Sequence, residues 1–251
     1  MAQFHNKQGR EFLKDTARKQ VDFAHTDQAR GESVPALEKP FDEGAKRIAL
    51  VKSRDFKNIE AVELRVAINR RRSRRNFSNK PLSLEELSFL LWATQGVQRV
   101  FGRASTFRTV PSAGARHTFE TYLCAANVDG LDKGIYRYLP LEHELLLVKP
   151  NDNVAGEVTR AALNQDFTLH AAVTFVWASV PYRMEWRYGA AAHKSIAIDA
   201  GHVCQNLYLA CEAVGAGCCA IAAYNQGALD ALLGIDGEDE FVVYLAAVGK
   251  N

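Results

Sequence analysis

The spacing of apolar residues predicts four helices. Between residues 81 and 97, Leu87, Leu90 and Leu91 form a stripe with a helical period. Ser83 and Glu86 form the signature of a capping box before this stripe, and Gly96 can end the helix. Further helices are predicted over residues 64–71, 195–214 and 225–235. The third of these is apolar on nearly every side, which is typical of a helix in a large core or a subunit interface.

Other apolar runs are short enough to be strands. They cover residues 47–51, 118–128, 171–180 and 240–250, and residues 134–149 alternate like a hairpin. No repeat and no Gly/Ser-rich linker divides the chain. These elements predict one α+β domain in which helices flank a mainly antiparallel sheet.

The N-terminal segment differs from the remainder of the chain. Residues 1–48 are polar with scattered aromatic residues, and they form either a loosely ordered arm or an arm wrapped over its own domain or a partner subunit. The predicted organisation is therefore an arm over residues 1–48 followed by a domain over residues 49–251.

Composition narrows the class of protein. The chain has 251 residues, of which 47% are apolar, and 31 basic residues nearly balance 29 acidic ones. A dedicated nucleic-acid-binding protein usually has a larger basic excess, so nucleic acid is not an expected partner. Five cysteines without a C-x-x-C pattern indicate buried free thiols in a reducing cytoplasm. The sequence shows neither a secretory signal nor a membrane span, and we expect a cytoplasmic protein.

The sequence lacks the usual catalytic motifs. No G-x-S-x-G, H-E-x-x-H, G-x-G-x-x-G or P-loop pattern occurs, and no residue set predicts a metal site. His202, within the apolar helix, is expected to be a core residue. An enzyme without an obvious side-chain catalyst often takes its chemistry from an organic cofactor.

Residues 70–75 contain five arginines around one serine. Guanidinium groups bind phosphate oxygens through two parallel hydrogen bonds, so a bound phosphate is the favoured ligand. Arg70 and Arg74 are expected to face water. A solvated basic face and an RNA-binding patch remain alternatives.

Three separated motifs occur in one order along the chain. They are the arginine-rich residues 71–77, "VPSAGARH" at residues 110–117, and a long stretch from His202 to Asn225 that precedes the final "AVGK". Together they resemble the nitroreductase family of FMN enzymes, and most of all its SagB-type or thiazoline-oxidase-like branch. The resemblance covers about residues 62–250.

The resemblance implies an intertwined homodimer with FMN at the subunit interface. The implied cofactor-binding residues are Arg71, Arg72, Ser73, Arg75, Pro111, Ser112, Ala113, Gly114, Gly217, Ile221, Ala222, Ala223 and Lys250. It also implies that the backbone N–H of Ala222 hydrogen-bonds flavin N5, where hydride is accepted. Tyr188 is the implied proton donor.

The chain departs at two places from the pattern of the family that it resembles. Many nitroreductases have Pro-x-Glu-Gly where this chain has residues 220–223, which leaves only a backbone role there. The azoline-oxidising members have a Lys-Tyr pair that corresponds to Arg187 and Tyr188, and a guanidinium is not a usable general base.

The predicted function is that of an FMN-dependent oxidoreductase. NADH or NADPH would reduce the flavin, and a nitroaromatic, a quinone or a related small acceptor would then reoxidise it in a ping-pong cycle. The second hypothesis is an FMN- and oxygen-dependent dehydrogenase of a peptide azoline or small heterocycle. A nucleic-acid-binding module and a flavin-binding protein without turnover are further alternatives.

Overall fold

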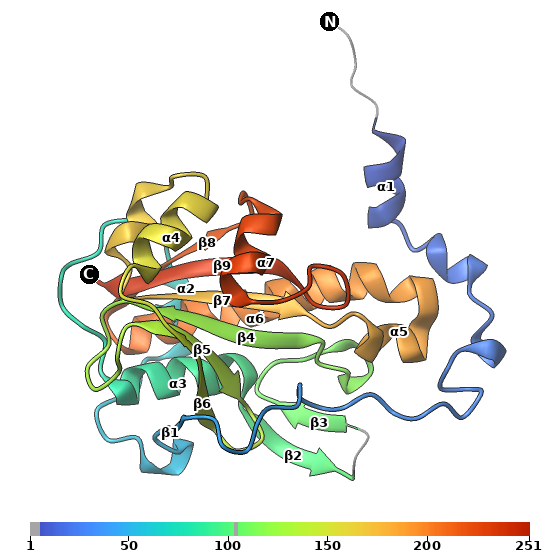
Figure 1. Cartoon of the computed structure of the whole chain (residues 1–251), viewed down its shortest axis with the longest axis horizontal. Coiled ribbons are helices and arrows are strands. Elements are labelled where there is room, and N and C mark those ends of the chain that lie inside the picture. The colour runs from blue at the N-terminus through green and yellow to red at the C-terminus, as the bar shows by residue number, and fades with distance from the viewer. Residues whose placement is uncertain (1–5, 103–104) are drawn as a thin grey trace, which may run out of the picture.

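The computed structural model describes residues 6–102 and 105–251. In Figure 1 a central sheet lies between helices on its two faces. The helices are α1 (Lys7–Leu13), α2 (Leu64–Arg70), α3 (Leu84–Gln95), α4 (Val154–Ala161), α5 (Tyr182–Tyr188), α6 (Ala192–Ala213) and α7 (Gln226–Leu233). The strands are β1 (Arg47–Ala49), β2 (Val97–Phe101), β3 (Ser105–Arg108), β4 (Phe119–Ala125), β5 (Gly134–Leu139), β6 (Glu144–Pro150), β7 (Val173–Ser179), β8 (Ala216–Ile221) and β9 (Phe241–Lys250).

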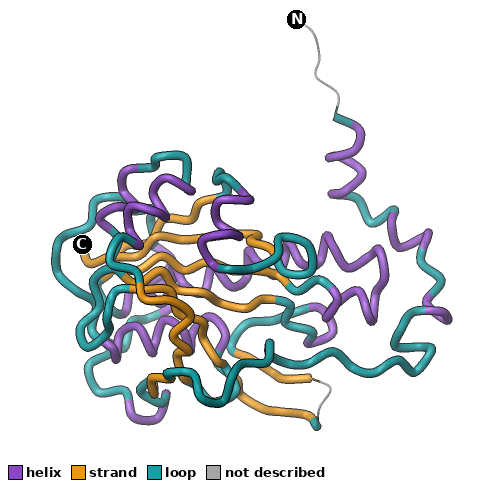
Figure 2. Tube along the Cα trace, viewed as in Figure 1, coloured by secondary structure: helices purple, strands orange, loops and turns teal. Residues whose placement is uncertain are grey.

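Seven strands form the main sheet in the order β1-β6-β5-β4-β7-β9-β8, and every neighbouring pair is antiparallel. Strands β2 and β3 form a separate antiparallel hairpin. The α+β fold with a mainly antiparallel sheet that the sequence predicted is confirmed. Figure 2 shows the strands of the main sheet running side by side through the middle of the molecule.

Alternation along the central strands divides the core between two layers of helices. Phe175 and Trp177 of β7 belong to the cluster that includes α3 and α6, whereas Val176 and Ala178 belong to the cluster that includes α4 and α7. Because successive side chains of a strand point to opposite faces, both faces of β7 are covered. This explains why every residue of β4, β5 and β7 is buried.

Helix α3 begins as predicted. Ser83 Oγ accepts from Glu86 N–H at 3.1 Å, and a Glu86 carboxylate oxygen accepts from Ser83 N–H at 2.8 Å. Both hydrogen bonds of the capping box are therefore present, and the two bonds satisfy donors that the helix leaves free.

Helix α6 has one buried face and one exposed face. Leu207 and Cys211 lie in the core, but Ile198 is 49% exposed, and Gly201 and His202 beside it are exposed too. The expectation that His202 is a core residue is therefore wrong. Its ring lies 3.7 Å from the Asp199 carboxylate on the rim of the helix.

The N-terminal segment crosses the body before β1. Lys39 N–H donates to Glu120 Oε1 at 2.8 Å, and Arg137 Nη2 donates to the Lys39 carbonyl oxygen at 2.8 Å. Arg108 Nη2 donates to the Leu37 carbonyl oxygen at 3.2 Å. Buried side chains thus hold this part of the segment, while α1 projects from the body in Figure 1.

Candidate functional site

The arginine-rich segment lies along the edge of the main sheet. After α2 ends at Arg70, Ser73 forms a parallel bridge with Cys218 of β8, and Arg74 N–H donates to the Cys218 carbonyl oxygen at 3.0 Å. Further on, Ser78 N–H donates to the Lys250 carbonyl oxygen at 2.8 Å. The segment therefore runs along the edge strand β8 and reaches the end of β9.

Two of the arginines serve the structure. Arg74 Nη1 lies 2.5 Å from Glu212 Oε1, and the side chain of Glu212 is only 8% exposed. The expectation that Arg74 faces water is wrong, because its charge compensates a buried carboxylate. Arg72 Nη1 donates to the carbonyl oxygens of Asn69 and Arg71 at 2.9 and 2.8 Å, where α2 ends.

Arg71 and Ser73 meet at Tyr208 of α6. Arg71 Cζ lies 5.4 Å from the centre of the Tyr208 ring, and Ser73 Oγ lies 3.0 Å from Tyr208 Oη. The same hydroxyl accepts from Ala220 N–H of β8 at 2.8 Å. Tyr208 therefore joins the arginine-rich segment to the end of β8. We did not predict this role, and its only signal in the sequence is a tyrosine in the "QNLYL" part of the third motif.

Arg75 lies close to Phe167 and to Cys219 of β8. Its Cζ is 5.7 Å from the centre of the Phe167 ring. Burial raises the pKa of the Cys219 thiol, and the charge and hydrogen bond of Arg75 oppose that rise. A pocket of about 550 Å³ opens beside Arg75 and is lined by Ser73, Arg74, Arg75, Asn76 and Asn251. Within the described residues, neither Arg71 nor Arg75 has a carboxylate at ion-pair distance.

Strand β8 ends beside this segment. Ile221 is buried, whereas Ala222 and Ala223 directly after it are exposed. Among residues 6–102 and 105–251, no acceptor meets the backbone N–H of Ala222 or Ala223. A Cβ at Gly217 would lie 2.8 Å from Arg74 Cβ, so this glycine allows the arginine-rich segment to approach β8.

Lys250 stands at the end of β9 near the same edge. Its Nζ lies 2.7 Å from Glu86 Oε1 and 2.5 Å from the Val214 carbonyl oxygen. The Lys250 charge is thus already paired, and it links β9 to the beginning of α3.

The loop of residues 111–114, which we call the PSAG loop, is fixed to α6. Ala113 N–H donates to Asp199 Oδ2 at 3.2 Å, and the Ser112 hydroxyl also bonds this carboxylate, whose pKa burial raises. Ser112 Oγ accepts from His117 N–H at 2.9 Å, and Pro111 before it is exposed.

Gly114 brings the loop against the end of α5. Its φ is +59°, and a Cβ there would lie 2.5 Å from Tyr188 Oη and 3.1 Å from Arg187 Cδ. Glycine suits this position, because a side chain would be strained at this φ and would meet Tyr188 and Arg187. The structure therefore places the PSAG loop next to the Arg187–Tyr188 pair.

The two halves of the predicted site hold different positions along α6. The PSAG loop is anchored at Asp199, and the arginine-rich segment meets Tyr208. Nine residues of helix correspond to about 14 Å at a rise of 1.5 Å per residue. The exposed face of α6 at Gly201, His202 and Gln205 lies between these anchors.

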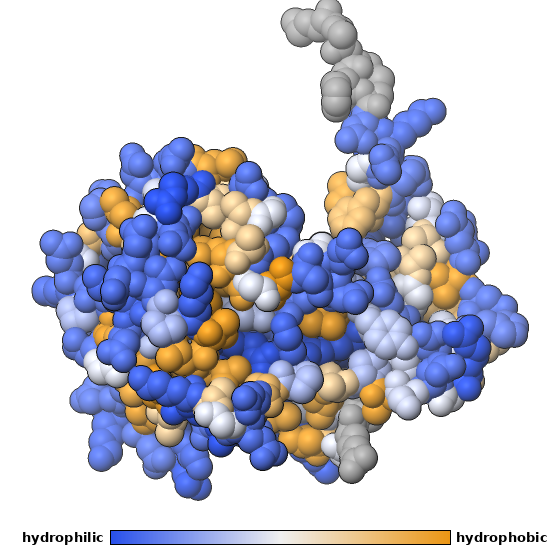
Figure 3. All heavy atoms as spheres, viewed as in Figure 1, coloured by the Kyte–Doolittle hydropathy of each residue, from blue (hydrophilic) through white to orange (hydrophobic). Residues whose placement is uncertain are grey.

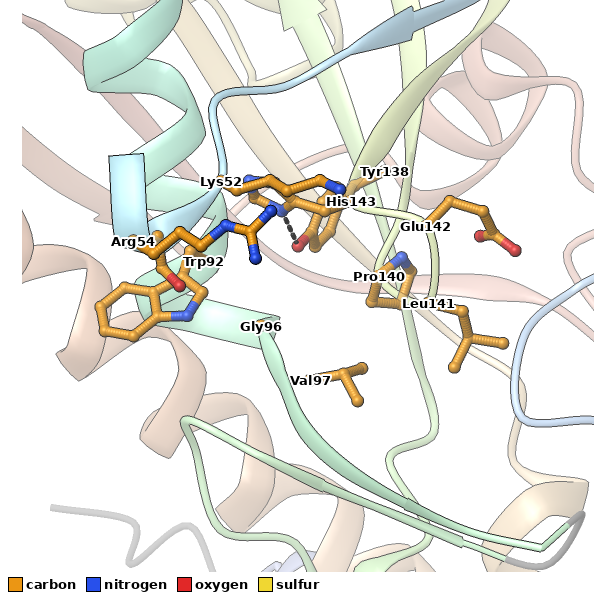
Figure 4. A pocket seen from close by; sticks show the side chains of 11 residues that line it. Lys52, Arg54, Trp92, Gly96, Val97, Tyr138, Pro140, Leu141, Glu142 and His143 are labelled. Carbon is orange, nitrogen blue, oxygen red and sulfur yellow. Dashed lines mark hydrogen bonds between the residues drawn. The ribbon is translucent and has the colours of Figure 1, made fainter. Parts of the chain in front are cut away.

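A second pocket of about 340 Å³ lies away from the predicted residues (Figure 4). Tyr138 Oη and His143 Nδ1 are 2.7 Å apart in it, and His143 Nε2 lies 2.8 Å from the Val51 carbonyl oxygen. Burial lowers the pKa of His143, which suits a neutral ring between these partners. The polar groups satisfy one another and hold the turn between β5 and β6.

All five cysteines are buried and free, as the sequence predicted. Among residues 6–102 and 105–251, no group of three or more His, Cys, Asp or Glu side chains could hold a metal ion. No helix in that part of the chain is long and apolar enough to cross a membrane.

Comparison with known proteins defines the class. A model of the nitroreductase family matches residues 68–250. The chain therefore belongs to the nitroreductase family, and the oxidoreductase class that the motifs predicted is confirmed at that level. A candidate nitroreductase of Methanocaldococcus jannaschii is 33% identical over 194 residues, which cover 77% of this chain and 94% of that protein.

Solved structures share the fold. A candidate nitroreductase from Ralstonia eutropha superimposes with a TM-score of 0.67 at 25% identity, over 86% of this chain and 97% of that one. A candidate nitroreductase from Anabaena variabilis gives a TM-score of 0.68 at 23% identity over 83% of this chain, which spans only 42% of that longer chain.

Two more distant structures contain a bound partner or cofactor. The E. coli microcin synthetase McbBCD complex, with truncated pro-MccB17 bound, has a TM-score of 0.61 at 18% identity and covers 92% of this chain and 82% of that one. A candidate nitroreductase from Desulfovibrio desulfuricans in complex with FMN has a TM-score of 0.53 at 18% identity, over 75% and 86% of the two chains. At this identity, the likeness to the synthetase complex shows a shared fold.

Proposed function

We propose that this chain is an FMN-dependent oxidoreductase that takes electrons from NADH or NADPH. It passes them to a nitroaromatic, a quinone or a related small acceptor, with donor and acceptor using one face of the flavin in turn. The observation that carries the proposal is the pair Arg71 and Arg75, two guanidinium groups at one sheet edge with no carboxylate partner among the described residues. Such a pair attracts a phosphate dianion.

The residues at this edge fit FMN. Arg71, Ser73 and Arg75 would hold the phosphate, and the exposed N–H groups of Ala222 and Ala223 would face the ring. Arg72 contributes charge near the phosphate while its side chain caps α2. Lys250 acts at longer range, because Glu86 already pairs with its ammonium group.

When bound, FMN supplies the hydride-accepting chemistry. The chain itself contributes binding, orientation and proton control. The N–H of Ala222 is free to hydrogen-bond the reacting edge of the ring, and the smallness of its side chain keeps the backbone accessible. Tyr188, held against Gly114, is the proposed proton donor to the acceptor.

A homodimer completes the proposed site. The arginine-rich segment and the PSAG loop are anchored nine residues apart on α6, with the exposed face at Gly201, His202 and Gln205 between them. A twofold dimer that buries this face would place the PSAG loop of one subunit near the arginine-rich segment of the other. Two equivalent sites at the interface follow from that symmetry.

The absorption spectrum and an anaerobic reduction test the function. We expect purified protein reconstituted with FMN to be yellow and to lose its visible flavin absorption when NADH or NADPH is added without oxygen. Addition of a nitroaromatic or quinone should restore the absorption. A protein that binds FMN but is not bleached by either nucleotide would contradict the reductase assignment, and a protein that does not bind FMN would contradict the proposal as a whole.

A further inference from the structure

A pocket of about 570 Å³ lies beside the PSAG loop, between the β2–β3 hairpin and the end of α5. One wall is apolar and contains Phe107, Val110 and Pro111. Phe107 is 51% exposed, and its ring centre lies 4.3 Å from that of Phe101. Figure 3 shows apolar side chains gathered over this hairpin. A flat ring fits such a wall.

The polar lining of this pocket carries no acidic residue. Arg108 and Arg187 line it, together with Gln98 and His117. Burial, followed by the charge of Arg108, lowers the pKa of His117 to about 3, so that its ring is neutral. The charged groups of the lining are therefore both cations.

Arg187 is available to a ligand. It is exposed, its Cζ lies 5.4 Å from the centre of the Tyr188 ring, and its stem packs beside Gly114. Among the described residues, no carboxylate lies at ion-pair distance from it. Arg108, in contrast, already donates hydrogen bonds to Gln95, Thr106 and the Leu37 carbonyl oxygen.

The surroundings add to the positive field. The charge of Arg187 lowers the pKa of Arg116, after the larger effect of burial, and Arg183 acts in the same direction. Two carboxylates of this region are already bonded: Glu120 to Arg183 and to Lys39 N–H, and Asp199 to Ala113 N–H and the Ser112 hydroxyl. The net effect on the pocket favours an anion over a neutral molecule.

We propose that this pocket binds a flat aromatic molecule that carries an anionic group, and that Arg187 pairs with that group. The role in turnover rests on the proposed function, because the PSAG loop places the pocket beside the partner's flavin only in the proposed dimer. The anion is either the carboxylate of an aromatic acceptor or a phosphate of the nicotinamide donor.

Binding without turnover tests the pocket itself. Affinities of benzoate and of its neutral analogue benzamide are measured by titration of the native protein and of Arg187→Gln, with Arg187→Lys as the charge-preserving variant. We expect benzoate to bind the native protein about tenfold more tightly than benzamide, which corresponds to about 1.4 kcal/mol. Arg187→Gln should bring the ratio of the benzoate and benzamide affinities close to one, and Arg187→Lys should retain part of the preference for benzoate. A ratio that Arg187→Gln does not change would overturn the proposal.

Turnover then identifies the source of the anion. If Arg187 binds the acceptor, Arg187→Gln lowers kcat/KM for 4-nitrobenzoate about tenfold and leaves that for 4-nitrobenzamide unchanged. If it binds the donor, kcat/KM for NADH falls while that for phosphate-free dihydronicotinamide riboside does not. Arg160→Gln, at an exposed arginine of α4, is the matched control and should change neither. Equal losses with charged and neutral substrates would contradict both sources.

The two proposals fail in different ways. A protein without flavin turnover still reports on the pocket through benzoate binding. A working flavin reductase that makes no distinction between benzoate and benzamide retains the proposed function and loses this inference.

Discussion

Two groups of arginines in this protein differ in their burial and in whether they have an acidic partner. Arg137 and Arg183 are buried around Glu120, which is 2% exposed and also accepts from Lys39 N–H. Arg71 and Arg75 lie at a sheet edge and have no acidic partner among the described residues. A buried charge must be compensated within the protein, whereas a charge in contact with water needs no partner in the protein and is open to a ligand.

The comparison teaches where to look for function. The buried group connects the N-terminal segment, β4, β5 and α5, and its charges serve to hold these elements together. The pair Arg71 and Arg75 contributes few contacts to the fold, so selection for stability alone does not explain it. We therefore assign structure to the first group and ligand binding to the second.

Glu120→Gln should give the largest effect on stability. The amide keeps the size and an acceptor, but it leaves two buried guanidinium groups without their counter-charge. We expect a loss of about 3–5 kcal/mol in the free energy of unfolding, measured by urea denaturation. The arginines also lower the pKa of Glu120, against the opposing effect of burial, so this stabilisation is present above pH 4.5 and is lost as the pH falls. A loss below about 1 kcal/mol in the free energy of unfolding at neutral pH would contradict the structural role assigned to the buried arginines.

Glu38→Gln should change the free energy of unfolding less than Glu120→Gln, and with the opposite pH dependence. Burial, and then the charges of Glu142 and Glu120, raise its pKa to about 8. The folded protein therefore holds a proton that the unfolded chain releases near pH 4.5, and stability falls between these values as the pH rises. We expect Glu38→Gln to gain about 1–2 kcal/mol relative to the native protein between pH 5.5 and pH 7.5. Parallel stability profiles for the two proteins would contradict this assignment.

The smallest stability effect is expected at Arg71 and Arg75. Arg71→Ala removes a cation–π contact with Tyr208, and Arg75→Ala removes a cation–π contact with Phe167 and a hydrogen bond with Cys219. Their free energies of unfolding without cofactor should stay within about 1 kcal/mol of the native value, as measured by urea denaturation. A larger loss would show that these arginines also belong to the fold.

Much of the fold could be predicted because its signals are local. The short apolar run of β7 and the capping box of α3 lie within a few neighbouring residues, and both elements formed where the sequence predicted them. Strand β8 was not predicted as a strand, because "AGCCAI" has small residues with weak strand preference. It forms because β9 offers a pairing partner along its whole length.

The missing parts of the site depend on contacts between distant residues. Glu212 pairs with Arg74 across 138 positions of sequence, and Tyr208 joins Ser73 to Ala220. No local pattern distinguishes these residues from other polar positions on a helix. The same limit explains why the expectation of a solvated Arg74 was wrong, while the roles assigned to Arg71 and Arg75 remain a prediction.

A titration with FMN tests the central claim most directly. Binding is followed by flavin fluorescence in the native protein, Arg71→Ala, Arg75→Ala and the double variant, with Arg160→Ala as the control. We predict that each single change weakens FMN binding about tenfold or more and that the double change weakens it about 100-fold or more, because each removes a charge-assisted hydrogen bond. Equal FMN affinity in the native protein and the folded double variant would contradict the account.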